Sequence, residues 1–405
     1  MPDERPHLLI LEPDPRGHAT EWIGHIAAAV GDTFAVTFAL APELAASLST
    51  AAAERNVRFV ALAPREQAMC LHRSLVVSAC ARWRIMRRYM KRVGATHGFF
   101  LSIDHLSLPL ALRLSAGHGR ISGFLFRPSV HYGGFESRPA RFRERLRDWR
   151  KDLLYRGMLR NPTLDTVLTL DPYFPDFARR RYRGGDKVAF VPDPVSPAAM
   201  ARRSDGAPGA RRARLLLFGE ITARKGVFTL FDALARLPAG IAQSLHVEIA
   251  GRHDPAIRSE IARAAGAALR GRPELRLRIE DRRLPDAELA ARVGDSDVIL
   301  APYQRFVGSS GVLLWAAATG VPVICQDYGL LGRLVQDHAL GIAVDTSDSA
   351  ALAGAIERAL RYGPDRLFDC RRAAAFARGC AAQRFGEAVL SCAARDRPAI
   401  AAQGK

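Results

Sequence analysis

The sequence of 405 residues lacks the features that define several protein classes. Its six cysteines are scattered and form no Cys-x-x-Cys pair, which is typical of reduced, mostly buried thiols rather than of a disulfide or zinc framework. No apolar run reaches the ~18 residues of a membrane-spanning helix. The apolar segment in MPDERPHLLILEPDP is too short for a signal peptide. We therefore expect a cytoplasmic protein, either soluble or attached to the inner membrane face only at its surface.

Acidic residues are also scarce relative to basic ones. The chain has 59 Lys and Arg against 41 Asp and Glu, which gives a net charge of +18. This excess favours partners that carry negative charge: nucleic acid, anionic lipid or phosphate-bearing small molecules. No Asp-x-Asp pair follows an expected strand, because the DSD at 295–297 comes before one. We therefore predict no metal site.

The chain is long enough for two domains of about 200 residues. Short β-branched runs alternate with helical patterns, which indicates parallel α/β sheets. We expect strands at 7–11, 33–40, 57–62, 98–103, 121–126, 165–170 and 188–192, and then at 214–219, 245–250, 275–280, 297–301, 321–325 and 341–344. The predicted fold is two Rossmann-like, doubly wound domains that face a central cleft. The predicted division is an N-terminal domain at 1–195, a linker at 196–213, a C-terminal domain at 214–385 and a tail at 386–405.

The stretch FVGSSGVLLWAAATGVPVI, residues 306–324, places a small polar loop directly before an apolar helix. Gly308 and Gly311 allow the backbone to approach a ligand, and Ser309 and Ser310 offer hydroxyl groups. The first helical turn, with Gly311 and Val312, presents unpaired N–H groups and the positive end of the helix dipole. These features suit a phosphate. The alternative is that a serine merely caps a buried helix.

The order of elements in the second half resembles that of retaining glycosyltransferases of the family-4 group, which have the GT-B fold. The resemblance is carried by LLLFGEITARKGVFTLFDALARL, VEIAGR, RLPDAELAARVGDSDVILAPYQ and GSSGVLLWAAATGVPVICQDYG. It covers residues 214–390 well and the first half only in outline. It implies a retaining, metal-independent hexosyltransferase that uses a nucleotide-diphosphate sugar as donor substrate and no further cofactor.

The resemblance also implies roles for the basic loop after the first strand of the second half. It makes Lys225 and Arg224 the catalytic cations that face the donor diphosphate, beside Gly219. The departing diphosphate would take the proton of the acceptor, so that electrostatic stabilisation is the main contribution of the protein. Glu220 stands where the family usually has an arginine, and Arg224 is the expected substitute. The alternative is that RKG is a solvated basic turn that caps a helix.

The chain departs from the family at two glutamates of the donor site. Val307 and Trp315 occupy those positions. The second family glutamate holds the ribose hydroxyls of the nucleotide, so that a carboxylate must come from elsewhere, with Asp327 or Glu220 as candidates. Otherwise the donor is bound differently, or activity has been lost.

The first half offers a second set of candidate residues at expected strand ends. Gly17 and His18 follow the first strand, where the family has a glycine-bearing loop near donor and acceptor. His131, in FLFRPSVHYGG, resembles the family histidine that reaches the sugar, with His105 as the alternative. A histidine at a strand end is also commonly a hydrogen-bonded structural residue.

Two basic segments interleaved with aromatic and aliphatic residues stand out in the first half, at 81–93 and 141–160. They resemble interfacial helices that rest on anionic lipid. The alternative is a pair of helices packed on their own sheet with a solvated arginine face.

We predict transfer of a sugar to a glycan or lipid-linked acceptor in cell-surface polysaccharide synthesis. A catalytically silent nucleotide-sugar-binding or scaffold protein of the same fold is the first alternative. A nucleic-acid-binding protein is the second, although no helix-turn-helix, zinc or RRM signature is present. The sequence leaves the donor, the acceptor and the oligomeric state open.

Overall fold

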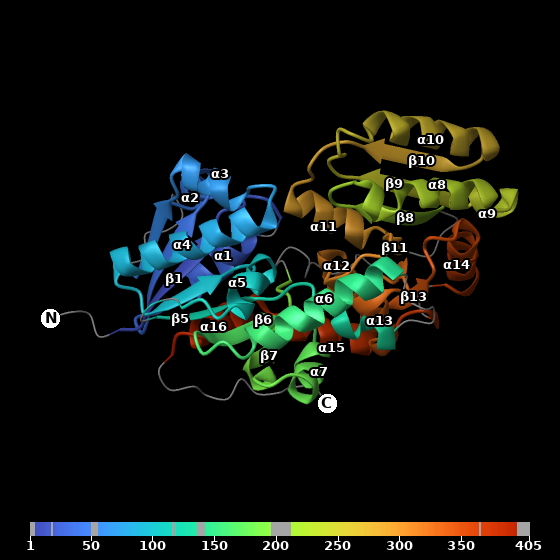
Figure 1. Cartoon of the computed structure of the whole chain (residues 1–405). Coiled ribbons are helices and arrows are strands. Elements are labelled where there is room, and N and C mark those ends of the chain that lie inside the picture. Colours follow the sequence, from blue (N-terminus) through green and yellow to red (C-terminus); the bar gives the residue numbers. More distant parts are fainter. Residues whose placement is uncertain are drawn as a thin grey trace. The chain divides into compact units, whose positions relative to one another are not determined.

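The chain forms two compact units (Figure 1). The computed structural model describes residues 5–17, 19–49, 56–115, 117, 119–135, 142–195, 212–363 and 366–394. Unit 1 comprises Met1–His131, Ala140–Pro194 and Ala381–Lys405, and unit 2 comprises Tyr132–Pro139 and Val195–Cys380. Each unit is built on its own parallel sheet with helices around it, which confirms the predicted pair of doubly wound domains.

The sheet of unit 1 has seven parallel strands in the order β3-β2-β1-β4-β5-β6-β7. They are β1 (His7–Glu12), β2 (Ala35–Leu40), β3 (Val57–Ala61), β4 (His97–Phe100), β5 (Arg120–Phe124), β6 (Leu164–Thr169) and β7 (Val188–Phe190). The order reverses between β1 and β4, which are hydrogen-bonded neighbours. Ligands of doubly wound sheets bind outside the carboxyl ends of the strands at such a reversal.

Helices cover both faces of this sheet because the side chains of a strand alternate between the faces. In β1, Leu9 and Leu11 pack with α4 to α7, whereas Leu8 and Ile10 pack with α1, α2 and α16. The helices are α1 (Ala19–Ala28), α2 (Pro42–Ser49), α3 (Pro64–Cys70), α4 (Leu75–Val93), α5 (Ser107–Ala111), α6 (Phe142–Met158), α7 (Phe174–Arg181) and α16 (Ala382–Ser391). No helix in the described ranges is both long and apolar enough to cross a membrane.

The C-terminal helix α16 completes the core of unit 1. Phe385 is fully buried, and its ring lies 4.7 Å from that of Trp22 and 5.2 Å from that of Phe124. The structure therefore differs from the predicted division, which ended the second domain at 385 and left a tail. The boundary at Pro194 lies one residue from the predicted one. Residues 196–211 of the predicted linker and 395–405 of the predicted tail lie outside the described residues.

The sheet of unit 2 has six parallel strands in the order β10-β9-β8-β11-β12-β13. They are β8 (Ala213–Phe218), β9 (Leu245–Ala250), β10 (Arg276–Glu280), β11 (Val298–Ala301), β12 (Val323–Gln326) and β13 (Gly341–Val344). The helices are α8 (Val227–Arg236), α9 (Ala239–Gln243), α10 (Arg258–Gly271), α11 (Asp286–Gly294), α12 (Gly311–Thr319), α13 (Gly329–Asp337), α14 (Ser349–Tyr362) and α15 (Cys370–Gly379). Here the order reverses between β8 and β11.

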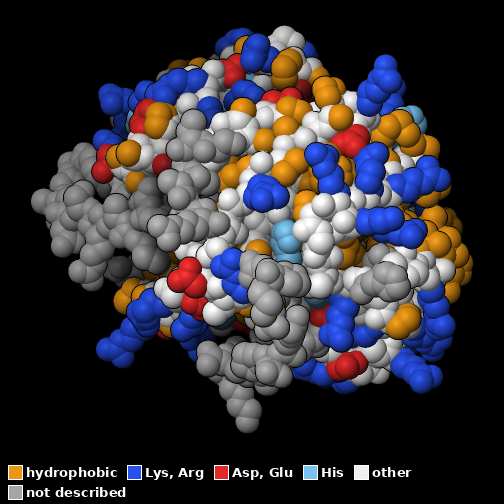
Figure 2. All heavy atoms as spheres, turned by 90° about the vertical axis from the view of Figure 1, so that its left-hand side faces the viewer, with side chains coloured by type: hydrophobic (Ala, Val, Ile, Leu, Met, Phe, Trp, Pro, Cys, Tyr) orange, Lys and Arg blue, Asp and Glu red, His pale blue; other side chains and the backbone are white. Residues whose placement is uncertain are grey.

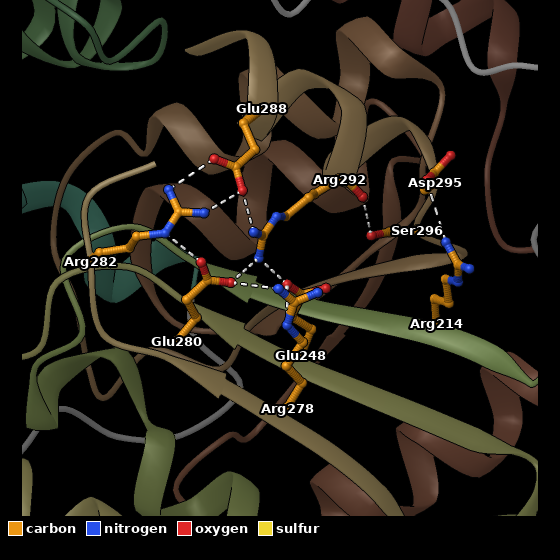
Figure 3. A network of polar contacts seen from close by, with 9 residues as sticks. All are labelled: Arg214, Glu248, Arg278, Glu280, Arg282, Glu288, Arg292, Asp295 and Ser296. Atoms are coloured by element: carbon orange, nitrogen blue, oxygen red, sulfur yellow. Dashed lines mark hydrogen bonds and ion pairs between the residues drawn. The ribbon is translucent and has the colours of Figure 1, made fainter. Parts of the chain in front are cut away.

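A network of ion pairs fixes α11 beside the edge of the unit 2 sheet (Figure 3). The guanidinium of Arg292 contacts Glu248 of β9, Glu280 of β10 and Glu288 within α11. Arg282 also donates to Glu288, at 2.8 Å. Hydrogen bonds from these two arginines lower the pKa of Glu288 to about 2. The network anchors the helix that leads into β11, and β11 carries one loop of the candidate site.

Candidate functional site

The candidate site lies at the carboxyl ends of β8 and β11, where the order of the unit 2 sheet reverses. The loop after β8 carries Gly219, Glu220 and a short 3-10 turn, η5 (Ala223–Lys225). The loop after β11 leads to Ser310, the residue before α12. The fold thereby brings the predicted basic turn and the predicted phosphate loop together, because adjacent parallel strands end at the same edge of a sheet.

Lys225 is buried beneath this edge, with 9% of its surface exposed. Its Nζ donates a hydrogen bond to the carbonyl oxygen of Phe218 at 3.2 Å and another to the hydroxyl of Tyr303 at 2.8 Å. An ammonium group has three N–H donors. Within the described part of the chain these are its only hydrogen bonds, so that one donor remains for a ligand.

The hydroxyl of Tyr303 connects Lys225 with the phosphate loop. It lies 3.0 Å from the hydroxyl of Ser310. Since Lys225 has no acceptor, the phenolic oxygen accepts from it. Either hydroxyl can donate in the contact between Tyr303 and Ser310. The chain Lys225–Tyr303–Ser310 thus carries the polarising effect of a buried cation to the start of α12.

The start of α12 has the geometry of an anion site. Ser310 has an extended backbone, with φ −139° and ψ 119°, and its side chain makes no capping hydrogen bond to the helix. The side chain of Ser310 therefore does not cap the N–H groups of the first turn, among them those of Gly311 and Val312. Gly308 has φ 136°, which favours glycine. The alternative interpretation, that Ser310 serves only as a helix cap, does not match this geometry.

The two loops also touch through their backbones. Gly226 has φ 74°, and a Cβ atom there would lie 1.8 Å from the carbonyl oxygen of Pro302. The N–H of Gln304 donates to the carbonyl oxygen of Arg224 at 2.9 Å. The guanidinium of Arg224 lies 4.5 Å from the ring centroid of Phe306, a cation–π contact. Glycine at 226 is therefore required for the basic turn to reach the second loop.

Gln326, at the end of β12, holds the second loop in place. Its side chain is 1% exposed, accepts from the N–H of Phe306 at 2.9 Å and donates to the carbonyl oxygen of Phe306 at 2.6 Å. Thr346 donates to the carbonyl oxygen of Tyr303 at 2.6 Å. Sequence analysis missed Tyr303 and Gln326. The only signal was their position at or just after a strand end, in APYQ and CQDYG.

The positions without the family glutamates are filled by apolar side chains. Val307 lies half-buried in the loop, and Trp315 packs edge-on against Phe218 with ring centroids 6.4 Å apart. Asp327 directly follows β12, the neighbour of β11 in the sheet. Glu220 is exposed, and a carboxylate oxygen lies 3.4 Å from Nη2 of Arg252. Both carboxylates stand at the expected edge, and their roles stay predictions.

The candidates of unit 1 occupy the carboxyl edge of the other sheet. Gly17 lies between β1 and α1 with φ 76°, and His18 lies outside the described residues. His105 follows β4 in a 3-10 turn, η1 (Asp104–Leu106), and is exposed.

His131 follows β5 and is enclosed by its own unit. Its Nδ1 lies 2.7 Å from the carbonyl oxygen of Pro128, and its Nε2 lies 3.1 Å from Oδ2 of Asp171, which follows β6. Its ring also contacts Phe174 and Phe177. Both ring nitrogens are thus engaged with the protein, which suits a residue that joins the ends of β5 and β6. The sugar contact proposed for His131 stays a prediction.

No group of three or more His, Cys, Asp and Glu side chains that could share a metal ion occurs among the residues described. The β8–β11 edge brings several donors together: the ammonium of Lys225, the guanidinium of Arg224, the hydroxyl of Ser310 and the N–H groups of α12. Such a set can bind an anion and stabilise negative charge that develops on it.

Part of the chain resembles a known family. Residues 212–362 match the model of the family described as glycosyl transferases group 1. Over 76 residues, 19% of the chain, the sequence is 38% identical to a phosphatidyl-myo-inositol mannosyltransferase of Mycobacterium leprae. The match spans about a fifth of that relative, 20% of its length.

Solved structures resemble the chain over nearly its whole length. A glycosyltransferase from Rickettsia africae has a TM-score of 0.65 at 11% identity, covering 96% of this chain and 98% of that one. HepE of Anabaena in complex with UDP has a TM-score of 0.66 at 13% identity, covering 95% and 98%. WaaG, a glycosyltransferase involved in lipopolysaccharide biosynthesis, has a TM-score of 0.62 at 15% identity, covering 96% and 100%. At these identities the likeness concerns the fold, and it confirms the GT-B fold.

Proposed function

We propose that the protein transfers a sugar from a nucleotide diphosphate to a glycan or lipid-linked acceptor. The match of residues 212–362 to the model of glycosyl transferases group 1 and the GT-B fold of the chain support this proposal. One observation carries the proposal: the hydrogen-bonded chain from Lys225 through Tyr303 to Ser310 at the start of α12. A buried cation, a hydroxyl relay and a helix N-terminus converge there, as an anionic diphosphate requires.

These groups would act on the leaving diphosphate. As the bond between sugar and diphosphate breaks, negative charge grows on the phosphate oxygens. Lys225 and the first N–H groups of α12 stabilise that charge without reorganising, because Gln326 and Gly226 already hold the two loops. The departing diphosphate accepts the proton of the acceptor, and the sugar is transferred with retention. No step in this scheme requires a metal ion.

Two of the similar proteins bear on the substrates. HepE binds UDP in the cited complex, and the partial match in Mycobacterium leprae is a mannosyltransferase that acts on phosphatidyl-myo-inositol. These support a nucleotide donor and a lipid-linked or glycan acceptor in cell-surface polysaccharide synthesis. The absence of carboxylates at Val307 and Trp315 favours a second candidate, a silent nucleotide-sugar-binding protein.

An exposed apolar stripe supports docking of unit 1 on an anionic membrane. Phe142, Leu146, Trp149 and Leu153 of α6 are 72%, 46%, 62% and 58% exposed, and their spacing places them on one side of the helix. Five exposed basic residues of α4 share a helical face: Arg84, Arg87, Arg88, Lys91 and Arg92. In Figure 2, Lys and Arg side chains are spread over one face of the molecule with hydrophobic side chains between them. This composition suits the inner membrane face.

Nucleotide binding and sugar transfer would be measured together. We expect one of UDP, GDP, ADP or dTDP to stabilise the protein by about 2.7 kcal/mol at a hundred times its dissociation constant. Lys225→Ala should weaken this nucleotide at least about tenfold, since a charged hydrogen bond is lost. Arg263→Ala, at an exposed position on α10, is the control and should change little.

The outcomes separate the two candidates. Transfer of the sugar from the stabilising nucleotide supports the proposed function. Binding that depends on Lys225 without any turnover supports the silent protein. Absence of binding for all four nucleotides contradicts both.

A further inference from the structure

Arg82 of α4 is a buried cation that the scheme above does not use. Arg82 is only 5% exposed, and its Nε donates to the carbonyl oxygen of Cys70 at 3.2 Å. In the part of the chain that the structure describes, this is its only hydrogen bond, and it forms no ion pair. A guanidinium has five N–H donors. Four donors and a desolvated positive charge are therefore left without a protein partner, which is costly unless an anion binds.

The position of Arg82 coincides with the reversal of strand order in unit 1. Helix α4 packs against β1 and against η1, the turn after β4. The charge of Arg82 acts on Glu12, at the end of β1, and on His105 in η1. Its guanidinium therefore lies near the carboxyl ends of β1 and β4, where a doubly wound sheet binds its ligand.

Below neutral pH, the groups that face this guanidinium do not neutralise it. Glu12 is buried and accepts from the N–H of Asp14 at 2.8 Å, and desolvation raises the pKa of Glu12 to about 7 in spite of the nearby Arg82. Burial likewise raises the pKa of Cys70, on α3, to about 11, so that it stays a neutral thiol. Asp14, in the loop after β1, pairs with Arg16 at 2.8 Å. His105 supplies no negative charge.

We propose that Arg82 binds an oxyanion, a phosphate or carboxylate group carried by the acceptor, at the carboxyl ends of β1 and β4. The inference rests on the proposed function, because it assigns this group to the acceptor. A planar guanidinium with free N–H donors matches the oxygens of either group in a bidentate arrangement. Glu12 sits beside this anion as its pH-sensitive neighbour.

The protonation state of Glu12 sets how the affinity of this site for an anion depends on pH. In its protonated form Glu12 has an O–H that can donate to the anion. Once ionised, it repels the anion and competes for the charge of Arg82. Anion binding is therefore strongest below neutral pH and weakens as the pH rises through the range in which Glu12 titrates. The other facing groups, Asp14 and Cys70, keep their charge state across that range.

Sulfate is the suitable first probe because it does not titrate near neutral pH. Its affinity for the full-length protein would be measured by calorimetry at constant ionic strength. We expect Arg82→Gln to weaken sulfate at least about tenfold, since a charged hydrogen-bonding partner is lost. Arg58→Gln, at an exposed position on β3 of the same unit, is the matched control. Equal affinities in the two variants would overturn the proposal.

Glu12→Gln provides a test that does not remove the buried cation. The affinity of the wild type for sulfate should fall about tenfold between pH 6 and pH 8.5. This change in binding free energy equals that of a shift of one pKa unit. Glu12→Gln should abolish that fall. A pH dependence that is the same in both proteins would exclude Glu12 as the neighbour of the anion and contradict the proposed site.

Two further probes identify the source of the anion. Hexyl phosphate and hexanoate present the oxyanion on a carbon chain, as an acceptor would. Competition of either with sulfate supports an acceptor group, whereas binding of sulfate alone would overturn that assignment. Binding of the nucleotide diphosphate should be unchanged in Arg82→Gln. If the wild type binds no nucleotide, the proposed function is contradicted. The effect of Arg82→Gln on sulfate affinity would still stand.

Discussion

Tyr303 occupies the centre of the candidate donor site although it carries no charge. Its hydroxyl joins Lys225 to Ser310, and its ring lies 4.6 Å from Nζ of Lys225. The phenol thus fixes the ammonium by a hydrogen bond and by a cation–π contact. In the proposed function, Tyr303 would act as a positioning residue for the diphosphate.

Tyr303→Phe tests this role because it removes only the hydroxyl. We expect the fold to be retained and the affinity for the nucleotide diphosphate to fall about tenfold, as one charge-assisted hydrogen bond is lost. Tyr182→Phe removes a hydroxyl that donates to Asp152 at 2.8 Å in unit 1 and serves as the control. Calorimetric titration of both variants gives the comparison. An unchanged affinity in Tyr303→Phe would exclude the relay.

Glu12 makes the stability of unit 1 depend on pH. Its pKa is raised by burial from 4.5 to about 7 in the folded protein. Below pH 4.5, Glu12 is protonated in both the folded and the unfolded protein, so that it does not lower the free energy of unfolding. As the pH rises from 4.5 to 7 the unfolded chain ionises first, so that stability is lost, and the full penalty persists above pH 7.

Glu12→Gln should therefore stabilise the protein at pH 8 and not at pH 4.5. The shift in pKa corresponds to a gain on the order of 3 kcal/mol at pH 8. Denaturant unfolding of the wild type and the variant at the two pH values measures it. Glu43→Gln, on α2, is a control with the same chemistry. A gain that is equal at both pH values would contradict the assignment.

At the scale of elements, α6 combines a buried and an exposed apolar side. Tyr155 and Met158 are buried in the core, whereas Phe142, Leu146, Trp149 and Leu153 are exposed. An exposed large apolar surface of this kind marks a contact with a membrane or a partner. The six Lys and Arg residues of α6 against its three Asp and Glu residues favour an anionic membrane.

Replacing Leu146, Trp149 and Leu153 together by serine should weaken binding to vesicles of phosphatidylglycerol and phosphatidylcholine at least about tenfold, because buried apolar area is lost. Tyr362→Ser, at an exposed apolar position on α14 in unit 2, is the control. Co-sedimentation at low and high salt gives the measurement. Equal binding of the two variants would exclude the stripe as the docking surface.

At the scale of the whole molecule, the chain crosses between its units more than once. Unit 1 is closed by α16, which follows all of unit 2 in sequence. Gly386 meets α1 closely, because a Cβ there would lie 2.7 Å from the carbonyl oxygen of His25. The two units are therefore not independent segments of the chain, and a protein truncated after Cys380 lacks part of the unit 1 core.

Phe385→Ala should destabilise unit 1 by about 3–5 kcal/mol, the usual cost of removing a buried phenylalanine. Hydrogen exchange should then increase in β1, β4 and β5 and stay unchanged in β8 to β13. Phe376→Ala, on α15, is the matched change in unit 2. Exchange that increases equally in both sheets after Phe385→Ala would contradict the assignment of α16 to unit 1.

The sequence by itself determined the strands, the two parallel sheets and the small polar loop between β11 and α12. These depend on local pattern: β-branched runs, helical periodicity, and glycines at turns such as Gly308. The positions of Lys225, Ser310 and Gly311 at one sheet edge followed from the rule that adjacent parallel strands end together.

Only the tertiary structure decided which side chains complete the sites. Tyr303 and Gln326 act through contacts with residues 7 to 78 positions away, and Arg82 is defined by burial beside the distant Glu12. The same holds for Phe385, which packs on Trp22. Local pattern carries no information about such pairs, because burial and hydrogen-bond partners depend on which segments the fold brings together in space.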